Sequence, residues 1–553
     1  MNCHFYVILV LLMLGLCYSA TPEVIRSTEY GLIRGELKTS EIDQNVQYYS
    51  FMSVPYASPP IGHLRFQEPI KHEAWQGVRN ATKLPDRCAQ PDQYFLTLAV
   101  LGSEDCLYLE ISEPLTSRNG SKELLPVLLW IHGGTFVFGA PHVSGPDYFM
   151  EKPVVYINVQ YRLNIFGFLS TTDECATGNF GLKDQLLALH WIQRNVKNFG
   201  GDPNRVTISG ASAGAASVIL HCLSPKSQGL FHRAISLSGT PLNRWALQRN
   251  PLEKMRRLAK GLGIDSDNTS IIVEELRRVD YRVLVKTVYN KSIMGDFIPY
   301  DAHPFAPSVE AEGPTAFITE RAFKLLDEGK FAKVPHIIGH TTEEGSFAYD
   351  YIHSGTTNLH LYETSPEILI PSSMNIPRDS ACSKKTLDEV KTFYFHNKTV
   401  TDPFSWTKYM SQDLFTRGIA KTAQLLAKKA DVYYYILSYN GSRPMSYHGG
   451  VGHYEDILYL FYVRNRWTNV RTPLDDLIRK RLVTIWTNFV TTGNPTPYSD
   501  PLLQNVTWPK FDEEESFLDI NKDLTIGQAP ERADRDFWKE LFRKCGSEPY
   551  HTY

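Results

Sequence analysis

Residues 207–218 read "TISGASAGAASV", and the arrangement of glycines in this stretch indicates a tight corner. An apolar, strand-like run enters the stretch, and an alanine-rich, helix-like run leaves it. Glycine weakens both strands and helices, so the two glycines that flank Ser212 predict a sharp strand-to-helix turn with the serine at its tip. Gly-x-Ser-x-Gly in that setting is a nucleophile elbow. The pentapeptide alone leaves a glycine-rich turn with an incidental serine as the alternative.

The sequence around this corner alternates strand-like and helix-like patterns. Apolar residues three and four positions apart indicate helices at 182–196 and 320–331. Continuous apolar runs typical of fully buried strands lie at 126–134, 154–162, 205–210, 233–239, 334–340 and 431–439. The alternation predicts an α/β fold with a large, mostly parallel central sheet and helices on both faces.

Chemically useful residues follow four of these strand-like runs. The segment 132–135, "HGGT", follows the first run, and its glycines allow backbone N–H groups to turn toward a ligand. Ser212 follows the third run, Glu343 and Glu344 follow the fifth, and His453 follows the sixth beyond a loop. Active sites of such sheets lie beyond the carboxyl ends of the strands, and the order serine, acid, histidine is one that this arrangement uses.

Each of these residue types has a role in nucleophilic catalysis. A serine hydroxyl needs an imidazole to accept its proton, and a carboxylate must orient that imidazole and stabilise its charged form. Backbone donors must stabilise the oxyanion, and losing one such donor typically costs about 3–4 kcal/mol. Spacing alone does not choose between Glu343 and Glu344, or between His453 and the neighbouring His448. Surface acidic residues and packed histidines are the alternative interpretation.

The N-terminal residues 1–20 are predicted to be a secretory signal peptide, which leaves 21–553 as the mature chain. Residues 7–16 form an apolar run too short to span a bilayer, and small residues follow it. A buried N-terminal helix is the alternative. No later run is apolar enough for a membrane helix, and the C-terminus is polar, so we expect no membrane anchor. The net charge of −3 favours no nucleic-acid partner.

Cysteine and asparagine patterns agree with secretion. None of the six cysteines after residue 20 forms a C-x-x-C motif, so we expect no metal, and no cofactor motif is evident. Secreted chains favour disulfides. Seven glycosylation acceptors of the form N-x-S/T occur, at Asn80, Asn119, Asn268, Asn290, Asn397, Asn440 and Asn505.

Nearly the whole mature chain resembles the type-B carboxylesterases, which include cholinesterases, juvenile hormone esterases and many secreted arthropod esterases. The matching motifs occur in the family's order: "SVPYASPPIGHLRF" (53–66), "SEDCLYLEI" (103–111), "WIHGGTFVFG" (130–139), "GNFGLKDQLLALHWIQRNVKNFGGDPNRVTISGASAG" (178–214), "SPKSQGLFHRAISLSGT" (224–240), "GHTTEEGSF" (339–347), "GVGHYEDILYLF" (450–461) and "WTNFVTTGNP" (486–495). The resemblance implies a single catalytic domain with an α/β-hydrolase fold. It also implies a secreted serine esterase that forms an acyl-enzyme with a small-molecule ester.

The resemblance also assigns roles to individual residues of the triad. The acid is the glutamate directly before Gly345, which is Glu344, and the base is the histidine of "GVGHYED", which is His453. These two residues would complete a catalytic triad with Ser212.

The oxyanion hole implied by the resemblance comes from two loops. Its donors would be the N–H groups of Gly134, Thr135 and Ala213, with Gly133 in the same loop. The family commonly has three consecutive glycines in this loop, and here Thr135 replaces the last. A β-branched residue narrows the backbone conformations available at that donor.

Two structural pairs are implied by the same resemblance. Cys88 would pair with Cys106, closing a loop worth about 3 kcal/mol in the chain-entropy model. Arg65 would form a structural ion pair with Glu104. The resemblance assigns no partners to the other mature cysteines, which are Cys175, Cys222, Cys382 and Cys545.

The subgroup within the family is only partly indicated. Cholinesterases carry a tryptophan inside the loop of the first disulfide and a glutamate before the nucleophile. This chain has no tryptophan between residues 88 and 106 and has Ala211 before the serine. Juvenile hormone esterases usually have glutamine there. We therefore expect a general carboxylesterase for small or medium apolar esters.

Three alternatives stay open. They are a juvenile-hormone-type or other specialised esterase, a protein that sequesters esters with slow turnover, and a non-catalytic binding or adhesion protein on the same fold. The oligomeric state stays open.

Overall fold

The structure is a computed structural model that describes most of the chain. It covers residues 23–92, 99–115, 123–294, 304–347, 360–396, 400, 402–442, 446, 449–463 and 472–548. The predicted signal peptide, residues 1–20, lies outside the described residues.

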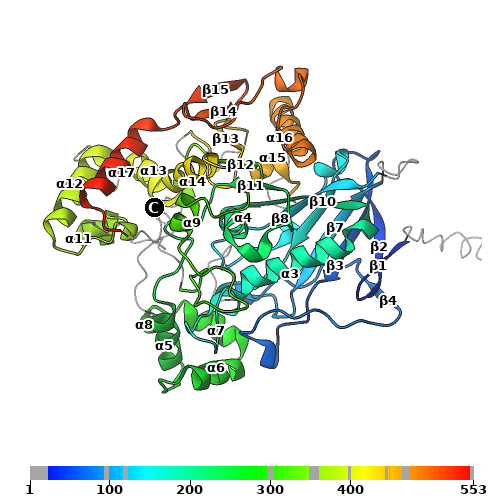
Figure 1. The fold of residues 1–553 in the computed structure, drawn as a ribbon, viewed down its shortest axis with the longest axis horizontal. Helices are drawn as coiled ribbons and strands as arrows, with labels where there is room; N and C mark the ends of the chain where they lie inside the picture. The colour runs from blue at the N-terminus through cyan, green and yellow to red at the C-terminus, as the bar shows by residue number, and fades with distance from the viewer. Residues whose placement is uncertain are drawn as a thin grey trace, which may run out of the picture.

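A large mixed sheet forms the centre of the molecule (Figure 1). Within the described residues it has 13 strands, in the order β1-β2-β3-β7-β9-β8-β10-β11-β12-β13-β14-β15, with β4 beside β2. The strands are β1 (Glu23–Thr28), β2 (Gly31–Thr39), β3 (Gln47–Pro55), β4 (Val78–Asn80), β7 (Tyr108–Pro114), β8 (Leu125–Ile131), β9 (Val155–Val159), β10 (Gly201–Ala211), β11 (Arg233–Leu237), β12 (His336–Thr341), β13 (Val432–Leu437), β14 (Ser516–Ile520) and β15 (Leu524–Gln528). A separate two-stranded ribbon pairs β5 (Gln90–Pro91) with β6 (Val100–Leu101).

The middle of the sheet is parallel, and its ends are antiparallel. Strands β9, β8, β10, β11, β12, β13 and β14 run parallel to one another. Strands β1, β2, β3 and β7 add antiparallel pairs at one end, and β15 adds one at the other. The six strand-like runs of the sequence are β8 to β13 in this central region. The predicted mostly parallel sheet is therefore confirmed, because continuous apolar runs suit strands covered on both faces.

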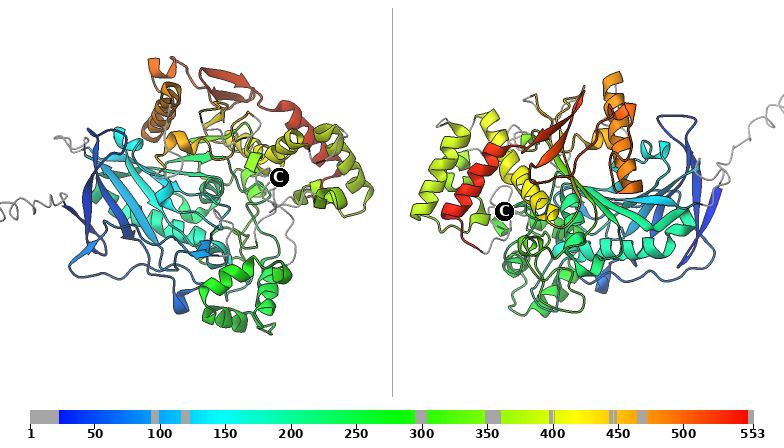
Figure 2. Two further views of the ribbon diagram at one scale, coloured as in Figure 1. Left: turned by 180° about the vertical axis from the view of Figure 1, so that it is seen from behind. Right: turned by 45° about the horizontal axis from the view of Figure 1, so that its top comes forward.

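Helices cover both faces of the sheet, as Figures 1 and 2 show. Helices α3 (Phe180–Asn195) and α4 (Ala213–Leu223) lie on one face, and α16 (Pro473–Thr492) lies on the other. The predicted helix at 182–196 corresponds to α3. The pattern at 320–331 yields a shorter helix, α9 (Ala322–Asp327), because the chain turns at Gly329, which has a φ of +67°.

The remaining helices gather in two groups beside the sheet (Figure 1). One group holds α5 (Pro251–Gly261), α6 (Thr269–Arg278), α7 (Tyr281–Val288) and α8 (Lys291–Met294), with α2 (Asn164–Phe168) packed on α7. The other holds α11 (His360–Thr364), α12 (Ala381–Phe395), α13 (Pro403–Ser411) and α17 (Arg532–Cys545). A π-helical turn, Gln412–Thr416, connects α13 to α14 (Arg417–Ala427), and α15 (Ile457–Leu460) precedes α16.

No helix among the described residues has both the length and the apolar character that a membrane crossing requires. The edge of the sheet where β8, β10, β12 and β13 end carries the residues that the sequence singles out. This edge is therefore where the site is built.

Candidate active site

Ser212 lies at the corner between β10 and α4 in a conformation that few residues adopt. Its φ of 56° and ψ of −120° lie outside the ordinary regions for a residue with a side chain. Its N–H donates to the carbonyl of Leu237 at 2.8 Å, which ties the corner to the neighbouring strand β11. The serine is 3 % exposed. The corner therefore presents a single hydroxyl at the end of the central strand.

The two glycines of the elbow are required by close backbone packing. A Cβ atom on Gly214 would lie 2.0 Å from the carbonyl oxygen of Ile131, and one on Gly210 would lie 2.5 Å from the carbonyl carbon of Gly214. Only glycine allows strand and helix to approach this closely. The local sequence thus explains why the turn forms at this position.

Glu344 reaches His453 from the turn that follows β12. Its carboxylate accepts hydrogen bonds from the Nδ1 of His453 at 2.5 Å, from the Ser238 hydroxyl at 2.5 Å and from the N–H of Thr341 at 2.8 Å. The side chain is fully buried. Burial raises the pKa of Glu344, but the nearby His453 and the hydrogen bonds from His453 and Ser238 outweigh it and lower the pKa overall. Glu344 is therefore held as a carboxylate against the histidine ring.

The adjacent Glu343 points in another direction. Its carboxylate accepts a hydrogen bond from the Ser446 hydroxyl, and its N–H donates to the carbonyl of Val451 at 2.8 Å. The structure thus separates the two glutamates that the sequence pattern leaves as alternatives. His448, the other histidine considered, lies outside the described residues.

His453 sits in a largely apolar surrounding, and its side chain is 13 % exposed. The ring centroid of Phe415 lies 4.5 Å from that of His453, and the centroid of Phe347 lies 5.6 Å away. Across the described part of the chain, no hydrogen bond joins the histidine ring to the Ser212 hydroxyl. Such bonds are often long in unliganded enzymes.

The loop after β8 lies against Ser212. A Cβ atom on Gly133 would lie 3.0 Å from the Cβ of Ser212. Thr135 and the following Phe136 have φ values of 53° and 63°, in the left-handed region that β-branched and bulky residues rarely adopt. The expected constraint at Thr135 is thus visible as backbone strain, with its hydroxyl donating to the carbonyl of Gly134 at 2.8 Å.

The N–H of Gly133 is already engaged. It donates to the hydroxyl of Tyr454 at 2.9 Å. Gly133 was expected in the oxyanion loop beside the donors, and in this arrangement its N–H is directed to the tyrosine. Gly134, Thr135 and Ala213 stay as the expected donors.

His132 has a structural position in this loop. Its Nδ1 hydrogen-bonds with the carbonyl oxygen of Gly133 at 2.9 Å, and its ring stacks on Tyr161 with centroids 4.5 Å apart. The Tyr161 hydroxyl donates to the His132 carbonyl at 2.8 Å. Burial lowers the pKa of His132 to about 4, so the ring is neutral at pH 7.

Two further residues near Glu344 and His453 were not found by sequence reasoning. Ser238 donates to Glu344 from the end of β11, in a left-handed conformation with φ of 55°. Asp456 is buried three positions after His453, and the Tyr435 hydroxyl donates to it at 2.9 Å. Burial and the nearby Glu344 raise the pKa of Asp456 to about 7. The only sequence signal for Ser238 was its place directly after a buried strand.

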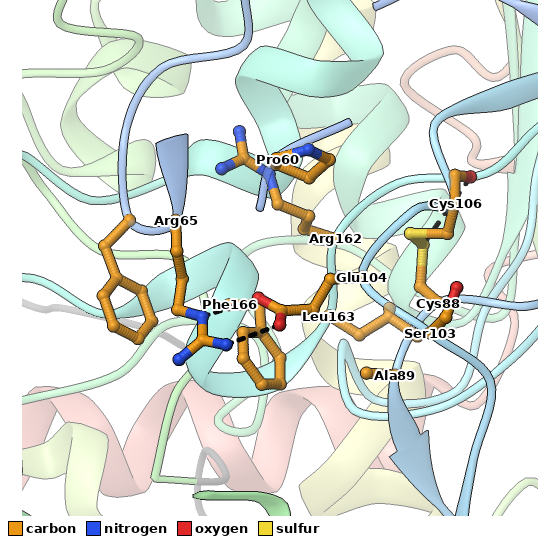
Figure 3. A pocket seen from close by; sticks show the side chains of 11 residues that line it. Pro60, Arg65, Cys88, Ala89, Ser103, Glu104, Cys106, Arg162, Leu163 and Phe166 are labelled. Atoms are coloured by element: carbon orange, nitrogen blue, oxygen red, sulfur yellow. Dashed lines mark hydrogen bonds and ion pairs between the residues drawn. A yellow bond between two sulfur atoms is a disulfide. The ribbon is translucent and has the colours of Figure 1, made fainter. Parts of the chain in front are cut away.

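The two structural pairs lie side by side around one small cavity (Figure 3). A disulfide joins Cys88 to Cys106, and Arg65 contacts Glu104 through two hydrogen bonds of 2.7 and 2.6 Å. Arg65 also donates to the carbonyl of Val279 just after α6, at 2.6 Å. The cavity between these residues is about 10 Å³, roughly the space of one water. This region is therefore packed as a structural support.

The other cysteines and the glycosylation acceptors also have defined surroundings. A second disulfide joins Cys382 in α12 to Cys545 in α17, whereas Cys175 and Cys222 are free within the described chain.

Of the glycosylation acceptors, Asn119 and Asn397 lie outside the described residues. The other five side chains are exposed: Asn80, Asn268, Asn290, Asn440 and Asn505. Among the described residues, no group of three or more histidine, cysteine or acidic side chains could hold a metal.

Comparison with known proteins places this geometry in context. The model of the carboxylesterase family matches residues 22–538. The chain is 34 % identical to venom carboxylesterase-6 of Apis mellifera over 543 residues, covering 93 % of this chain and 94 % of that protein. It is also 34 % identical to juvenile hormone esterase of Tribolium castaneum, covering 87 % and 84 % of the two chains. The crystal structure of juvenile hormone esterase from Manduca sexta, with OTFP covalently attached, superimposes with a TM-score of 0.83 at 28 % identity, covering 94 % of this chain and 100 % of that one.

Proposed function

The chain belongs to the carboxylesterase family and is a carboxylic ester hydrolase, and on that premise we propose that it is a secreted serine esterase. Ser212 is the nucleophile, His453 is the general base and Glu344 orients the histidine. The substrate is a small-molecule ester, and the reaction passes through an acyl-enzyme. The observation that carries this proposal is the hydrogen bond between Glu344 and His453, in a chain whose elbow holds a strained serine.

The proposed mechanism follows from the hydrogen bond that orients the His453 ring. Because Nδ1 of His453 bonds to Glu344, Nε2 is the nitrogen that accepts the proton from the Ser212 hydroxyl. The serine oxygen attacks the ester carbonyl, and the carbonyl electrons move onto oxygen. The imidazolium then gives its proton to the departing alcohol as the acyl-enzyme forms. Water repeats the sequence with the same base and releases the acid.

The oxyanion of each tetrahedral intermediate is stabilised by backbone donors in this proposal. The N–H groups of Gly134, Thr135 and Ala213 are the assigned donors. Support comes from the position of the loop at 133–136 directly against Ser212. Fixed donors in a buried site need no reorganisation during the reaction, which is why they are effective.

The surroundings of the base support apolar esters as the substrate class. Phe347 and Phe415 flank the His453 ring, so an apolar group of the substrate would replace water there at a gain in free energy. A charged acyl group would lose hydration without a partner from these rings.

Secretion is part of the proposal. It is supported by the apolar N-terminal run, by five exposed glycosylation acceptors and by two disulfides, which persist in oxidising compartments. We assign residues 1–20 to the signal peptide and 21–553 to one catalytic domain.

A juvenile-hormone-type esterase is the second candidate function. It is favoured by the juvenile hormone esterases among the similar proteins. Ala211 before the nucleophile argues against it, because that subgroup usually has glutamine there. Comparing kcat/KM for juvenile hormone with kcat/KM for simple short-chain and medium-chain esters separates the two.

The direct test labels the purified secreted protein with an organophosphate and maps the adduct by mass spectrometry. We expect a stoichiometric adduct on Ser212 and no ester hydrolysis by Ser212→Ala. Active-site titration alongside a panel of acyl esters then separates efficient catalysis from sequestration, which would give a burst without turnover. Hydrolysis that persists without an adduct on Ser212 contradicts the assignment. Binding of esters with neither burst nor turnover would favour a binding protein.

A further inference from the structure

The residue directly after the proposed base adopts an unusual conformation. Tyr454 has a φ of 77°, in a region that bulky side chains rarely enter. Such a conformation persists only where surrounding contacts hold it, and it occurs most often at functional sites. The Tyr454 ring centroid lies 5.3 Å from that of His453. The strained backbone thus turns a tyrosine ring into the site, alongside the base.

The hydroxyl of this tyrosine reaches the other side of the site. It accepts a hydrogen bond from the N–H of Gly133 at 2.9 Å. A Cβ atom added to Gly133 would lie 2.3 Å from this hydroxyl and 3.0 Å from the Cβ of Ser212. One hydrogen bond therefore connects the loop that carries the base to the loop that faces the nucleophile.

The loop at 133–136 needs such support, because its backbone is strained. Thr135 and Phe136 both have positive φ values, although neither is glycine. Its N-terminal end is held by the Tyr161 hydroxyl, which donates to the His132 carbonyl at 2.8 Å. Its far end is held by the N–H groups of Val137 and Phe138, which donate to the Gly134 carbonyl. The Tyr454 bond to the Gly133 N–H holds the other side of the same peptide group, because the His132 carbonyl and the Gly133 N–H belong to one peptide.

We propose that Tyr454 is a positioning residue for the oxyanion hole. Its hydroxyl fixes the peptide between His132 and Gly133. The loop then leaves this fixed peptide in one direction, which orients the following N–H groups of Gly134 and Thr135 toward the substrate oxygen. The same bond keeps the base loop at a constant distance from these donors. The inference rests on the proposed function, because it takes Ser212 as the nucleophile.

The test removes only the hydroxyl, with Tyr454→Phe. We expect kcat to fall about 10- to 100-fold with KM within a few-fold, because a misaligned donor is lost mainly in the transition state. The affinity for a trifluoromethyl ketone, whose serine adduct carries an oxyanion, should fall by the same factor as kcat/KM. The affinity for a non-reactive ketone of the same shape should change little. If Tyr454 contributed only to stability, the substitution would change the affinities for the two ketones equally.

The matched control is Tyr281→Phe. That hydroxyl also bonds to a backbone group, donating to the carbonyl of Gly102 at 3.1 Å, but it lies on α7. We expect this variant to keep wild-type kinetics and inhibitor affinity. All rates are divided by the concentration of titrated active sites, so that unfolded protein does not lower the measured kcat.

Two results would overturn the proposal. The first is wild-type kcat and wild-type ketone affinity per titrated site in Tyr454→Phe while Ser212→Ala is inactive. The second, which needs no variant, is a crystal structure of the ketone adduct in which Gly133 leaves Tyr454 and binds the oxyanion itself. Activity of Ser212→Ala would instead contradict the proposed function, so the two failures are distinguishable.

Discussion

The turn after β12 holds two adjacent glutamates, and only one of them contacts His453. Glu343 and Glu344 are neighbours in sequence, yet only Glu344 is buried against His453. Its lowered pKa keeps it ionised at neutral pH, where it can stabilise an imidazolium. The carboxylate of Glu343 is bound to Ser446 instead.

This difference predicts a large loss of activity for one conservative substitution and almost no loss for the other. Glu344→Gln keeps the shape but removes the charge, so kcat should fall by about 10³- to 10⁴-fold. Glu343→Gln is the matched control and should stay within a few-fold of wild type. Steady-state hydrolysis of a short-chain ester measures both. Equal losses in the two variants would disprove the assignment.

Asp456 is a second single residue with a measurable consequence. Burial and the facing Glu344 raise the pKa of Asp456 from 3.8 to about 7. Between about pH 4 and 7, Asp456 is therefore protonated in the folded chain and ionised in the unfolded chain. This group therefore stabilises the folded state at low pH, and its contribution is lost as pH rises from about 4 through 7.

Asp456→Asn tests the sign of this effect, because asparagine is neutral at every pH. The melting temperature of the variant relative to wild type should be higher at pH 8 than at pH 4. Thermal unfolding in a buffer series measures the difference. A constant difference across the series would show that Asp456 does not titrate in the folded state.

At the level of secondary structure, the elbow joins β10 to α4 through two close backbone contacts. Gly214→Ala would place a methyl group 2.0 Å from the Ile131 carbonyl. We expect a loss of about 1–3 kcal/mol in unfolding free energy and a large loss of activity. Gly313→Ala is the control, since a Cβ there meets no atom within 4 Å. An active, fully stable Gly214→Ala would mean that the elbow tolerates a wider turn.

The disulfide between Cys382 and Cys545 joins α12 to α17 across 163 residues of chain. Closing so long a loop restricts the unfolded chain, and the chain-entropy model values it at about 5 kcal/mol. Replacing both cysteines by serine should therefore lower the melting temperature by several degrees or more. Cys175→Ser, which removes a free thiol, is the control and should change little. An unchanged melting temperature in the double variant would mean that this crosslink does not stabilise the fold.

Across the whole molecule, buried histidines predict sensitivity to acid. Burial lowers the pKa to about 4 for His132, His142 and His336, and to about 3 for His221. In the unfolded chain these rings bind protons near pH 6.5, whereas the folded chain excludes them. The unfolded state therefore binds more protons between about pH 6.5 and 4, and stability falls as pH decreases through that range.

The effect should appear as a falling unfolding midpoint in urea between pH 6.5 and 4. Three carboxyl groups whose pKa values are raised mainly by burial oppose this effect but are fewer: Asp456, Glu310 and Asp534. A His221→Gln variant can keep hydrogen bonds to Ser227 and Gln185, and it should reduce the slope of midpoint against pH. A flat or rising midpoint on acidification would contradict this prediction.

The parallel centre of the fold and the elbow could be predicted from local patterns. Continuous apolar runs give strands wherever both faces are covered, and paired glycines around a serine favour a tight turn between a strand and a helix. The antiparallel end strands β1 and β2 carry no comparable signal, because they are only partly buried. The pairing of Cys382 with Cys545 was also out of reach, since cysteine partners depend on distances between helices far apart in sequence.

Local sequence by itself determined that a serine, an acidic pair and a histidine follow buried strands of an α/β sheet, and the resemblance chose Glu344 and His453 among them. Tertiary structure alone decided where their side chains point. In the folded chain Ser446 donates to Glu343 and Ser238 donates to Glu344. The Gly133 N–H donates to Tyr454. Periodicity reports the burial of a residue within its own element. Partners across loops are set by how separate elements pack, and no local pattern contains that information.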